Sequence, residues 1–339
     1  MTVVLSRRFA WKIPIDLGAK MKLDNFAVGV APSTAQRLRG IHAATVCPLN
    51  PDLSVDEATL HRILKKLSDT VGIRGFLING HAGENAQLNR SEKILVTNVA
   101  RDAVGTDFFI TTGVYSEDAF TAAAHARDAE EAGADAILVF PPNAWALGKN
   151  TDLVVAHHRA IADATSLPIL LYQSPVTAAA MPYSVETLQK LAEIPTVAGI
   201  KEGSWEVATY EENRLAFKAV RPDAVVLGSG DEHLLAAYIL GTEGSQVSLA
   251  SVIPEPMLEL WEASERGDWE TARELHRLIY PLATAIYRAK PGFLATARLK
   301  ACLKIIGLIS SDAMRSPGLV VPSDEYRVLE AAIRHAQNR

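Results

Sequence analysis

Short apolar runs recur along the chain, and a helical pattern separates each run from the next. Uninterrupted apolar runs of this length are typical of buried β-strands. Eight of them can be recognised: 41–46, 75–79, 108–113, 136–140, 168–172, 197–201, 224–228 and 245–249. Eight strand–helix units in succession predict an α/β chain folded as a (β/α)8 TIM barrel. A doubly wound sheet would have fewer strands and a Gly-rich phosphate loop after the first one, and residues 47–51 are not Gly-rich.

The helical patterns between the runs begin and end at recognisable signals. Ser54 is a plausible N-cap, and Gly72 and Gly133 stand where helices are expected to end. After the eighth run the chain continues to residue 339, which is too long for one barrel helix. We therefore predict an N-terminal extension (1–39), the barrel (40–266) and a helical C-terminal domain (267–339) packed against it.

Charge and cysteine use narrow the class of protein. The formal net charge is −5 and the sequence pI is about 6.0, so no basic surface for nucleic acid is expected. Cys47 and Cys302 lie far apart, which indicates a reducing compartment, and Cys47 is expected to be a buried packing residue. No apolar run is long enough to cross a bilayer. We expect a cytoplasmic protein without a membrane partner, although a basic targeting segment within residues 1–20 remains an alternative.

The carboxyl ends of the predicted strands hold the residues that could carry chemistry, because that end of a barrel forms its active site. Lys201 ends the sixth apolar run. Burial lowers the pKa of a lysine, and a neutral amine can form a Schiff base with a ketone. Tyr172 ends the neighbouring fifth run, where its hydroxyl could shuttle protons. Taken alone, either residue could instead be structural: the lysine could reach solvent, and the tyrosine could cap the core.

Two glycine-containing loops follow other strands. The loop from Gly80 to Gly83 comes after the second strand, and its N–H groups could hold a carboxylate, with Glu84 bracing the loop through backbone hydrogen bonds. An ordinary strand–helix turn is the alternative. Gly230, after the seventh strand, could offer backbone groups at the barrel mouth, and Asp231 beside it is expected to be a helix N-cap.

Four motifs appear together in this order: Gly80-His81-Ala82-Gly83-Glu84, Tyr172-Gln173-Ser174-Pro175, Gly199-Ile200-Lys201-Glu202 and Ser229-Gly230-Asp231. From about residue 40 onward the chain thereby resembles the dihydrodipicolinate synthase / N-acetylneuraminate lyase family, which are pyruvate-dependent class I aldolases on a (β/α)8 barrel. The resemblance implies that Lys201 forms the Schiff base and Tyr172 relays protons. It implies that Gly80, His81, Ala82 and Gly83 hold the carboxylate, that neither metal nor organic cofactor is needed, and that the protein is a homo-oligomer, a tetramer.

The chain departs from the family pattern on the proton-relay side. The family loop carries two hydroxyl residues where this chain has His81 and Ala82, so His81 could replace the lost proton carrier. The synthases have Pro-Tyr-Tyr after the fourth strand, with one tyrosine that reaches across a subunit interface, and here Asn143 follows two prolines.

The second-substrate side also departs from the pattern. Thr177 stands where the synthases place an arginine for a substrate carboxylate, Gln173 replaces an asparagine, and Gln246 replaces an apolar residue. An arginine–carboxylate pair is a strong contact, so its loss argues against strict synthase activity. Gln173, Ser174, Thr177 and Gln246 could instead bind hydroxyl groups.

We expect a lyase, aldolase or dehydratase that acts on pyruvate or another small-molecule 2-oxo acid, such as a 2-keto-3-deoxy sugar acid, through an imine on Lys201. One alternative is dihydrodipicolinate synthase itself, with Arg159 or Lys149 in place of the missing arginine. A second is a homologue that binds keto acids without turnover. A third is a metal-dependent hydrolase or class II aldolase that would need His42, His81, Glu84 and His233 to converge.

Overall fold

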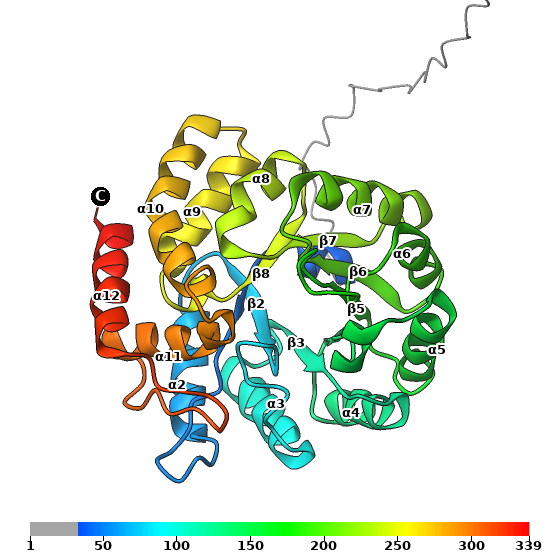
Figure 1. Ribbon diagram of the computed structural model, residues 1–339, viewed down its shortest axis with the longest axis horizontal. Coiled ribbons are helices and arrows are strands. Elements are labelled where there is room, and N and C mark those ends of the chain that lie inside the picture. The colour runs from blue at the N-terminus through cyan, green and yellow to red at the C-terminus, as the bar shows by residue number, and fades with distance from the viewer. Residues whose placement is uncertain (1–32, 339) are drawn as a thin grey trace, which may run out of the picture. The chain divides into compact units, whose positions relative to one another are not determined.

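The computed structural model describes residues 33–338, so most of the predicted N-terminal extension lies outside the described residues. In the described part, eight parallel strands pair in chain order and close into a barrel (Figure 1). The strands are β1 (Gly40–Ala44), β2 (Ile73–Ile78), β3 (Phe109–Val114), β4 (Ala136–Val139), β5 (Ile169–Gln173), β6 (Val197–Glu202), β7 (Val225–Gly228) and β8 (Gly244–Val247). The predicted (β/α)8 barrel is confirmed.

Helices alternate with the strands and surround the barrel (Figure 1). They are α2 (Glu57–Ser68), α3 (Arg90–Val104), α4 (Ala119–Glu131), α5 (Thr151–Ala162), α6 (Val185–Ala192), α7 (Val207–Val220), α8 (Leu234–Ile239) and α9 (Pro254–Glu265). Short 3-10 turns also occur in the connections: η1 (Asn143–Leu147), η2 (Asp231–His233), η3 (Leu249–Ser251) and η4 (Gly292–Leu294). Side-chain N-caps start most of the longer helices, as Asp56 does for α2.

The first and last strands end before the apolar runs that predicted them. β1 ends at Ala44 rather than at residue 46, and β8 ends at Val247 rather than at residue 249. Val46 and Leu249 are nevertheless buried, at 3% and 0% exposure. An apolar run indicates that its residues are buried, and it does not show where the strand ends. Val46 lies in the loop after β1 and Leu249 begins η3, and both are buried in the same apolar cluster.

A short helix before β1 packs against the barrel interior. In α1 (Thr34–Leu38), Leu38 is fully buried in a cluster with Leu77 and Phe109, which face into the barrel. Arg37 forms an ion pair with Asp135, with an Nη1–Oδ1 distance of 3.0 Å. Residues 33–38, placed by the sequence in the extension, therefore belong to the packing of the barrel.

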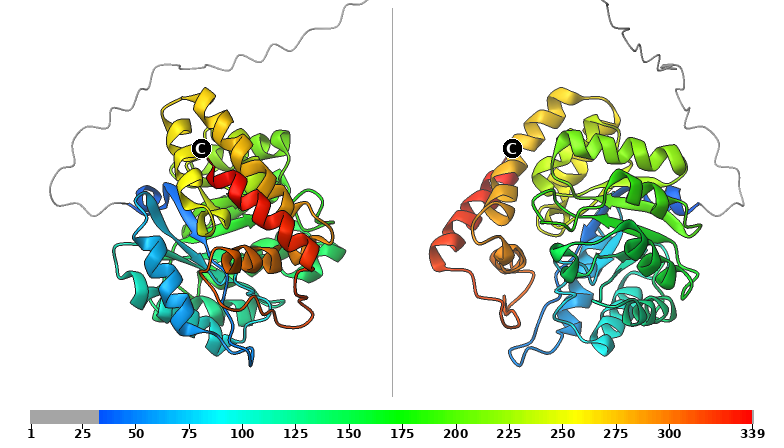
Figure 2. Two further views of the ribbon diagram at one scale, coloured as in Figure 1. Left: turned by 90° about the vertical axis from the view of Figure 1, so that its left-hand side faces the viewer. Right: turned by 45° about the vertical axis from the view of Figure 1, so that its right-hand side comes forward.

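Three further helices follow α9: α10 (Trp269–Tyr287), α11 (Ala295–Ile305) and α12 (Ser323–Gln337). They gather on one side of the barrel (Figure 2). One continuous buried cluster joins their apolar residues to those of β1, β2, α2 and α9. The C-terminal helices and the barrel therefore share a core.

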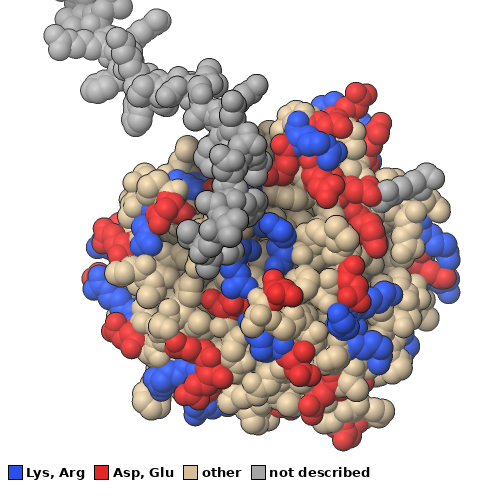
Figure 3. All heavy atoms as spheres, turned by 180° about the vertical axis from the view of Figure 1, so that it is seen from behind, with Lys and Arg blue, Asp and Glu red and all other residues tan. Residues whose placement is uncertain are grey.

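The surface has no extended basic area on the face shown in Figure 3, where acidic and basic side chains are interspersed. This agrees with the slightly negative net charge. Within residues 33–338, no helix is long and apolar enough to span a membrane.

Candidate active site

Lys201 and Tyr172 meet at the carboxyl end of the barrel. In the sheet register Lys201 pairs with Tyr172 on β5 and with Leu227 on β7. Side chains alternate between the two faces of a strand, so both paired residues point into the barrel. Both line one cavity of about 180 Å³, together with the predicted site residues Gly80, His81, Ala82, Gly230 and Gln246.

The amine of Lys201 has the electrostatic character that imine chemistry needs. Burial lowers the pKa of Lys201 from 10.5 to about 8, and the charge of Asp231 acts in the opposite direction. Burial likewise raises the pKa of Asp231 to about 6. At pH 7 about a tenth of the amine is then neutral, against less than a thousandth at an ordinary lysine pKa. The site therefore holds a useful population of nucleophile at neutral pH.

Three aromatic rings cluster beside the cavity, and two of them, those of His81 and Tyr172, line it. The ring of His81 lies 5.1 Å from that of Tyr172 in an edge-on arrangement and 4.2 Å from that of Phe140. Burial, and then the charge of Lys201, lowers the pKa of His81 to about 4, so this imidazole is neutral at pH 7. Burial, and then the charge of Glu202, raises the pKa of Tyr172 above its ordinary value, so the phenol keeps its proton. A neutral imidazole beside a protonated phenol can pass a proton in either direction.

The loop after β2 is a compact turn. The N–H of Glu84 donates to the carbonyl of His81 at 3.1 Å, and the N–H of Asn85 donates to the carbonyl of Gly80 at 3.2 Å. A Cβ atom at Gly83 would lie 3.2 Å from the backbone nitrogen of Asn79, which is tighter than an ordinary contact. Glycine at this position therefore allows the loop to close on itself beside the cavity.

The C-terminal helix α11 supports this loop from the other side. We predicted that Glu84 would brace the loop by accepting backbone N–H groups, and this is wrong. Its carboxylate forms a buried ion pair with Lys300 instead. Lys300 also donates to the carbonyl of Ala313 at 2.8 Å, and Thr296 donates to that of His81 at 3.3 Å. A charge buried this deeply requires a charged partner, so the loop and α11 are positioned together.

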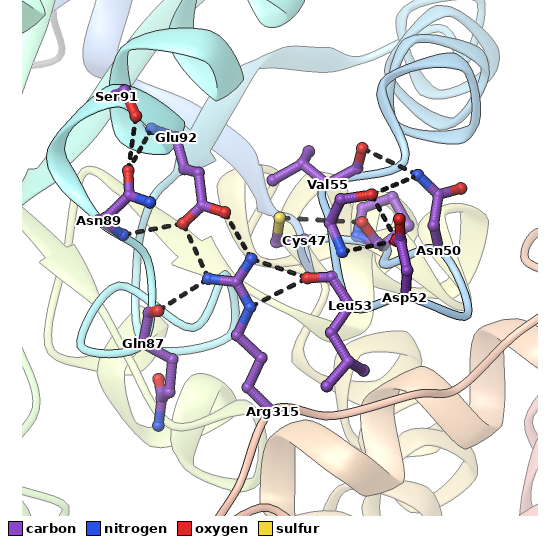
Figure 4. Close-up of polar contacts among 12 residues, drawn as sticks. Cys47, Asn50, Asp52, Leu53, Val55, Gln87, Asn89, Ser91, Glu92 and Arg315 are labelled. Carbon is purple, nitrogen blue, oxygen red and sulfur yellow. Dashed lines mark hydrogen bonds and ion pairs between the residues drawn. The ribbon is translucent and has the colours of Figure 1, made fainter.

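Arg315 binds the loops after β1 and β2 to the C-terminal segment (Figure 4). Its guanidinium donates to the carbonyls of Leu53 at 2.7 Å and Gln87 at 2.9 Å. It also forms an ion pair with Glu92, in which Nη1 donates to Oε2 at 2.8 Å. These contacts span more than 200 positions of sequence separation.

Replacing Arg315 by alanine is expected to lower the free energy of unfolding by about 2 kcal/mol, because Glu92 and two carbonyls lose their partner in a mostly buried place. For a protein of this size this lowers the thermal midpoint by about 3 °C. Calorimetry measures the change. Arg334→Ala is the control, because the Arg334–Glu330 pair is exposed on α12 and should contribute little. Equal midpoints for the two variants would contradict the prediction.

Four residues that were expected to bind substrate do not line the cavity: Gly83, Gln173, Ser174 and Thr177. Gln173 follows Tyr172 on β5, so its side chain points to the opposite face of the strand. Its amide donates to the carbonyl of Tyr183 at 3.1 Å and accepts from the N–H of Tyr183 at 2.8 Å. Thr177 is exposed in the loop after β5. The structure therefore gives Gln173 a role in holding this loop and places none of the four where it was expected.

Other sequence expectations are corrected by the packing. Asp231 is not a helix N-cap: its Oδ1 accepts the N–H of Leu249 at 2.8 Å. His42 is fully buried, with Nε2 3.1 Å from the carbonyl of Leu38, and Glu84 is paired with Lys300. No group of three or more potential metal ligands gathers within residues 33–338, so the four residues proposed for a metal site do not converge. Cys47 is buried, as expected.

The cavity also contains residues that the sequence reasoning missed. Trp205 lies four positions after Lys201, in the loop after β6, and the strand-end rule could have indicated it. Thr45 follows β1 and could have been found in the same way. Tyr287 at the end of α10 and Thr296 on α11 carried no such signal, because they come from helices beyond the barrel.

Comparison with known proteins agrees with this architecture. A model described as the Dihydrodipicolinate synthetase family matches residues 37–336. The 4-hydroxy-tetrahydrodipicolinate synthase of Methylobacterium radiotolerans is 30% identical over 306 residues, which cover 89% of this chain and 97% of that protein.

Solved structures show the same fold. The dihydrodipicolinate synthase of Agrobacterium tumefaciens is 27% identical, with a TM-score of 0.78 over 89% of this chain and 99% of that one. YagE, a prophage protein of E. coli K12 solved in complex with pyruvate, is 22% identical, with a TM-score of 0.82 over 88% and 99% of the two chains. Because the family model spans most of the sequence and the synthase relative is covered almost completely, this chain belongs to the dihydrodipicolinate synthetase family and is a lyase of the class I aldolase type.

Proposed function

We propose that this lyase forms an imine between Lys201 and a 2-oxo acid, and that its substrate is pyruvate or a 2-keto-3-deoxy sugar acid. The observation that carries the proposal is a lysine with a pKa of about 8 that faces Tyr172 in a cavity at the carboxyl end of the barrel. A lowered lysine pKa in a cleft is a recognised mark of a functional amine.

The reaction begins when the neutral amine of Lys201 adds to the C2 carbonyl of the substrate. Tyr172 donates a proton to the resulting C2 hydroxyl, which leaves as water and yields the protonated imine. The imine nitrogen then accepts the electron pair of a bond to C3. When this is the C3–C4 bond, the C4 hydroxyl gives its proton to the Tyr172 phenolate and C4 leaves as an aldehyde. When it is the C3–H bond, the enamine electrons return and expel the C4 hydroxyl, which takes up a proton and leaves as water. His81, neutral and in ring contact with Tyr172, can exchange a proton with the phenol through one ring nitrogen while it exchanges one with water through the other.

The loop from Gly80 to Gly83 binds the substrate carboxylate in this proposal. Gly80, His81 and Ala82 line the cavity, and successive backbone N–H groups in a tight turn suit an anion. Ala82 leaves the N–H groups in place without adding a hydroxyl. The buried ion pair between Glu84 and Lys300 holds the loop in position.

The rest of the cavity wall suits an uncharged, hydroxylated part of the substrate. Among the described residues that line the cavity, Lys201 is the only lysine or arginine, whereas Thr45, Gln246, Ser248 and Thr296 offer hydroxyl or amide groups. Gln246 donates to Thr111 at 3.1 Å, and its Oε1 is buried without a partner. Hydroxyl groups of a sugar acid would satisfy such atoms.

Dihydrodipicolinate synthase activity is the second candidate, favoured by the name of the Methylobacterium relative. It would need a cation for the carboxylate of aspartate semialdehyde. Lys149 donates to the carbonyl of Pro182 at 2.7 Å, and Arg159 is exposed on α5. Neither candidate for the missing arginine lines the cavity. An assay with pyruvate and aspartate semialdehyde, run beside a panel of 2-keto-3-deoxy sugar acids, separates the two activities.

Sodium borohydride with pyruvate is expected to add a reduced pyruvyl group to the peptide that contains Lys201, detected by mass spectrometry. Because only the neutral amine reacts, the initial labelling rate should rise about tenfold per pH unit well below pH 8 and level off above it. Label on another lysine, such as Lys290 or Lys300, would overturn the assignment.

The protein is expected to form a homotetramer in the cytoplasm. Phe120, Leu147 and Val176 are 82%, 95% and 44% exposed and lie on α4, η1 and the loop after β5, which belong to successive units of the barrel. Exposed apolar side chains of this size favour burial between subunits. Sedimentation at micromolar concentration should give the mass of a tetramer, and a monomer would contradict the expectation.

A further inference from the structure

A second polar group of the site lies on the side of Lys201 opposite to Tyr172. Tyr172 comes from β5, Lys201 from β6, and Asp231 from the turn after β7. Asp231 lines the same cavity and is only 3% exposed. Because it follows the end of β7 at Gly228, it lies nearer the barrel mouth than Lys201, which pairs with Leu227.

The carboxylate of Asp231 is held by hydrogen bonds rather than by an ion pair. Its Oδ1 accepts the N–H of Leu249 at 2.8 Å, and the hydroxyl of Tyr287 interacts with the carboxylate and with Ser248. Arg288 forms its ion pair with the neighbouring Glu232, whose Oε1 lies 2.7 Å from Nε of Arg288. Burying a carboxylate that has no ion pair costs free energy of folding. The presence of Asp231 at this position therefore indicates a chemical role.

We propose that Asp231 is a second acid–base group of the lyase, which takes the proton from the Lys201 ammonium before the amine attacks and is positioned by Tyr287. This inference rests on the proposed function, because it concerns formation of the Lys201 imine. In the first step the Asp231 carboxylate gains one proton and the ammonium becomes the neutral amine. Once the amine has added to C2, the added nitrogen passes one proton to the C2 oxygen, and the protonated Asp231 or Tyr172 supplies the second proton with which the resulting hydroxyl leaves as water.

The surroundings of Asp231 suit this exchange. The two groups form no ion pair within residues 33–338, and the cavity of about 180 Å³ has room for a water that bridges them. The titratable and charged groups that influence Asp231 come from β6, η2, α8 and α10, and they are Lys201, Glu232, Tyr238 and Tyr287. A pKa near 6 for Asp231 lies close to working pH, where an acid–base group is most effective.

The Asp231→Asn variant separates this role from a purely electrostatic one. The Asp231 charge raises the pKa of Lys201, so its loss as a mere charge would give more neutral amine and faster pyruvate labelling at pH 7. As an acid–base group, its loss is expected to slow borohydride labelling by pyruvate about a hundredfold at pH 7. Labelling at the wild-type rate or faster would overturn the proposal.

Tyr287→Phe tests the positioning role and does not depend on folding of the asparagine variant. The Tyr287 hydroxyl lowers the pKa of Asp231, so its removal should move the acid limb of the labelling profile to higher pH. The rate at pH 6 is expected to fall several-fold and that at pH 9 to change little. An unshifted profile with normal rates would contradict positioning by Tyr287.

Tyr326→Phe is the matched control. Tyr326 on α12 also donates to a carboxylate, that of Asp312, but neither residue lines the cavity. Its profile should match that of the wild type. If the wild-type protein itself gave no label on Lys201, the proposed function would fail. If it gave label and the Asp231→Asn variant gave as much, only the present inference would fail.

Discussion

The Lys201→Met variant is expected to lose pyruvate labelling completely and to lower the kcat of lyase turnover by about four orders of magnitude or more. Methionine keeps the length and apolar character of the side chain, so the barrel should fold with an unchanged thermal midpoint. No other described residue of the cavity wall carries a primary amine. Turnover assays and circular dichroism measure the two properties.

Lys93→Met is the control for this prediction. Burial lowers the pKa of Lys93 to about 8 as well, but Lys93 lies on α3 outside the cavity that holds Lys201. This variant should keep full labelling, which would show that position in the cavity decides reactivity and that a lowered pKa alone does not. Turnover by Lys201→Met at more than a hundredth of the wild-type rate would remove the imine from the mechanism.

Tyr172→Phe is expected to reduce turnover by about two to four orders of magnitude, because in the proposed mechanism the phenol supplies the proton with which the C2 hydroxyl leaves as water. The ring contacts with His81 and Phe140 remain in the variant, so the fold should be unaffected. Steady-state kinetics with any accepted 2-oxo acid measures the loss in kcat.

Tyr183→Phe is the matched control for that measurement. Tyr183 is also buried, and its hydroxyl lies 3.4 Å from Nε2 of His158, outside the cavity. Near-normal turnover is expected for this variant. A near-normal rate for Tyr172→Phe as well would exclude the phenol from the proton relay.

The parts of the site that could be predicted from sequence follow from strand ends. Lys201 and Tyr172 were expected near one another, and they are paired in the sheet register, because neighbouring parallel strands present their last residues at the same barrel mouth. Gln173 was wrongly expected to bind substrate. A motif indicates that a residue lies near a site, but it does not show on which face of the strand the side chain lies. The alternation along β5 sends Tyr172 inward and Gln173 toward the loop at Tyr183.

The groups that the sequence could not reveal are joined by long-range contacts. Asp231 resembled an N-cap because a carboxylate at a helix start is common, yet its partners are Leu249 and Tyr287. Nothing in the spacing of Glu84 indicated that its charge would be matched by Lys300, more than 200 residues further along the chain. Such pairs are formed by packing and leave no local periodicity.

The amino-acid sequence alone determined the barrel, its order of strands and the amine at the end of the sixth, because apolar periodicity and residue type are local properties that act along the chain. Only the tertiary structure decided which surfaces close the cavity. The C-terminal helices bring Tyr287 and Thr296 to its wall and bind the glycine loop through Lys300. The physical reason is that burial and electrostatic pairing depend on distance in space, and residues remote in sequence become neighbours only after the chain has folded.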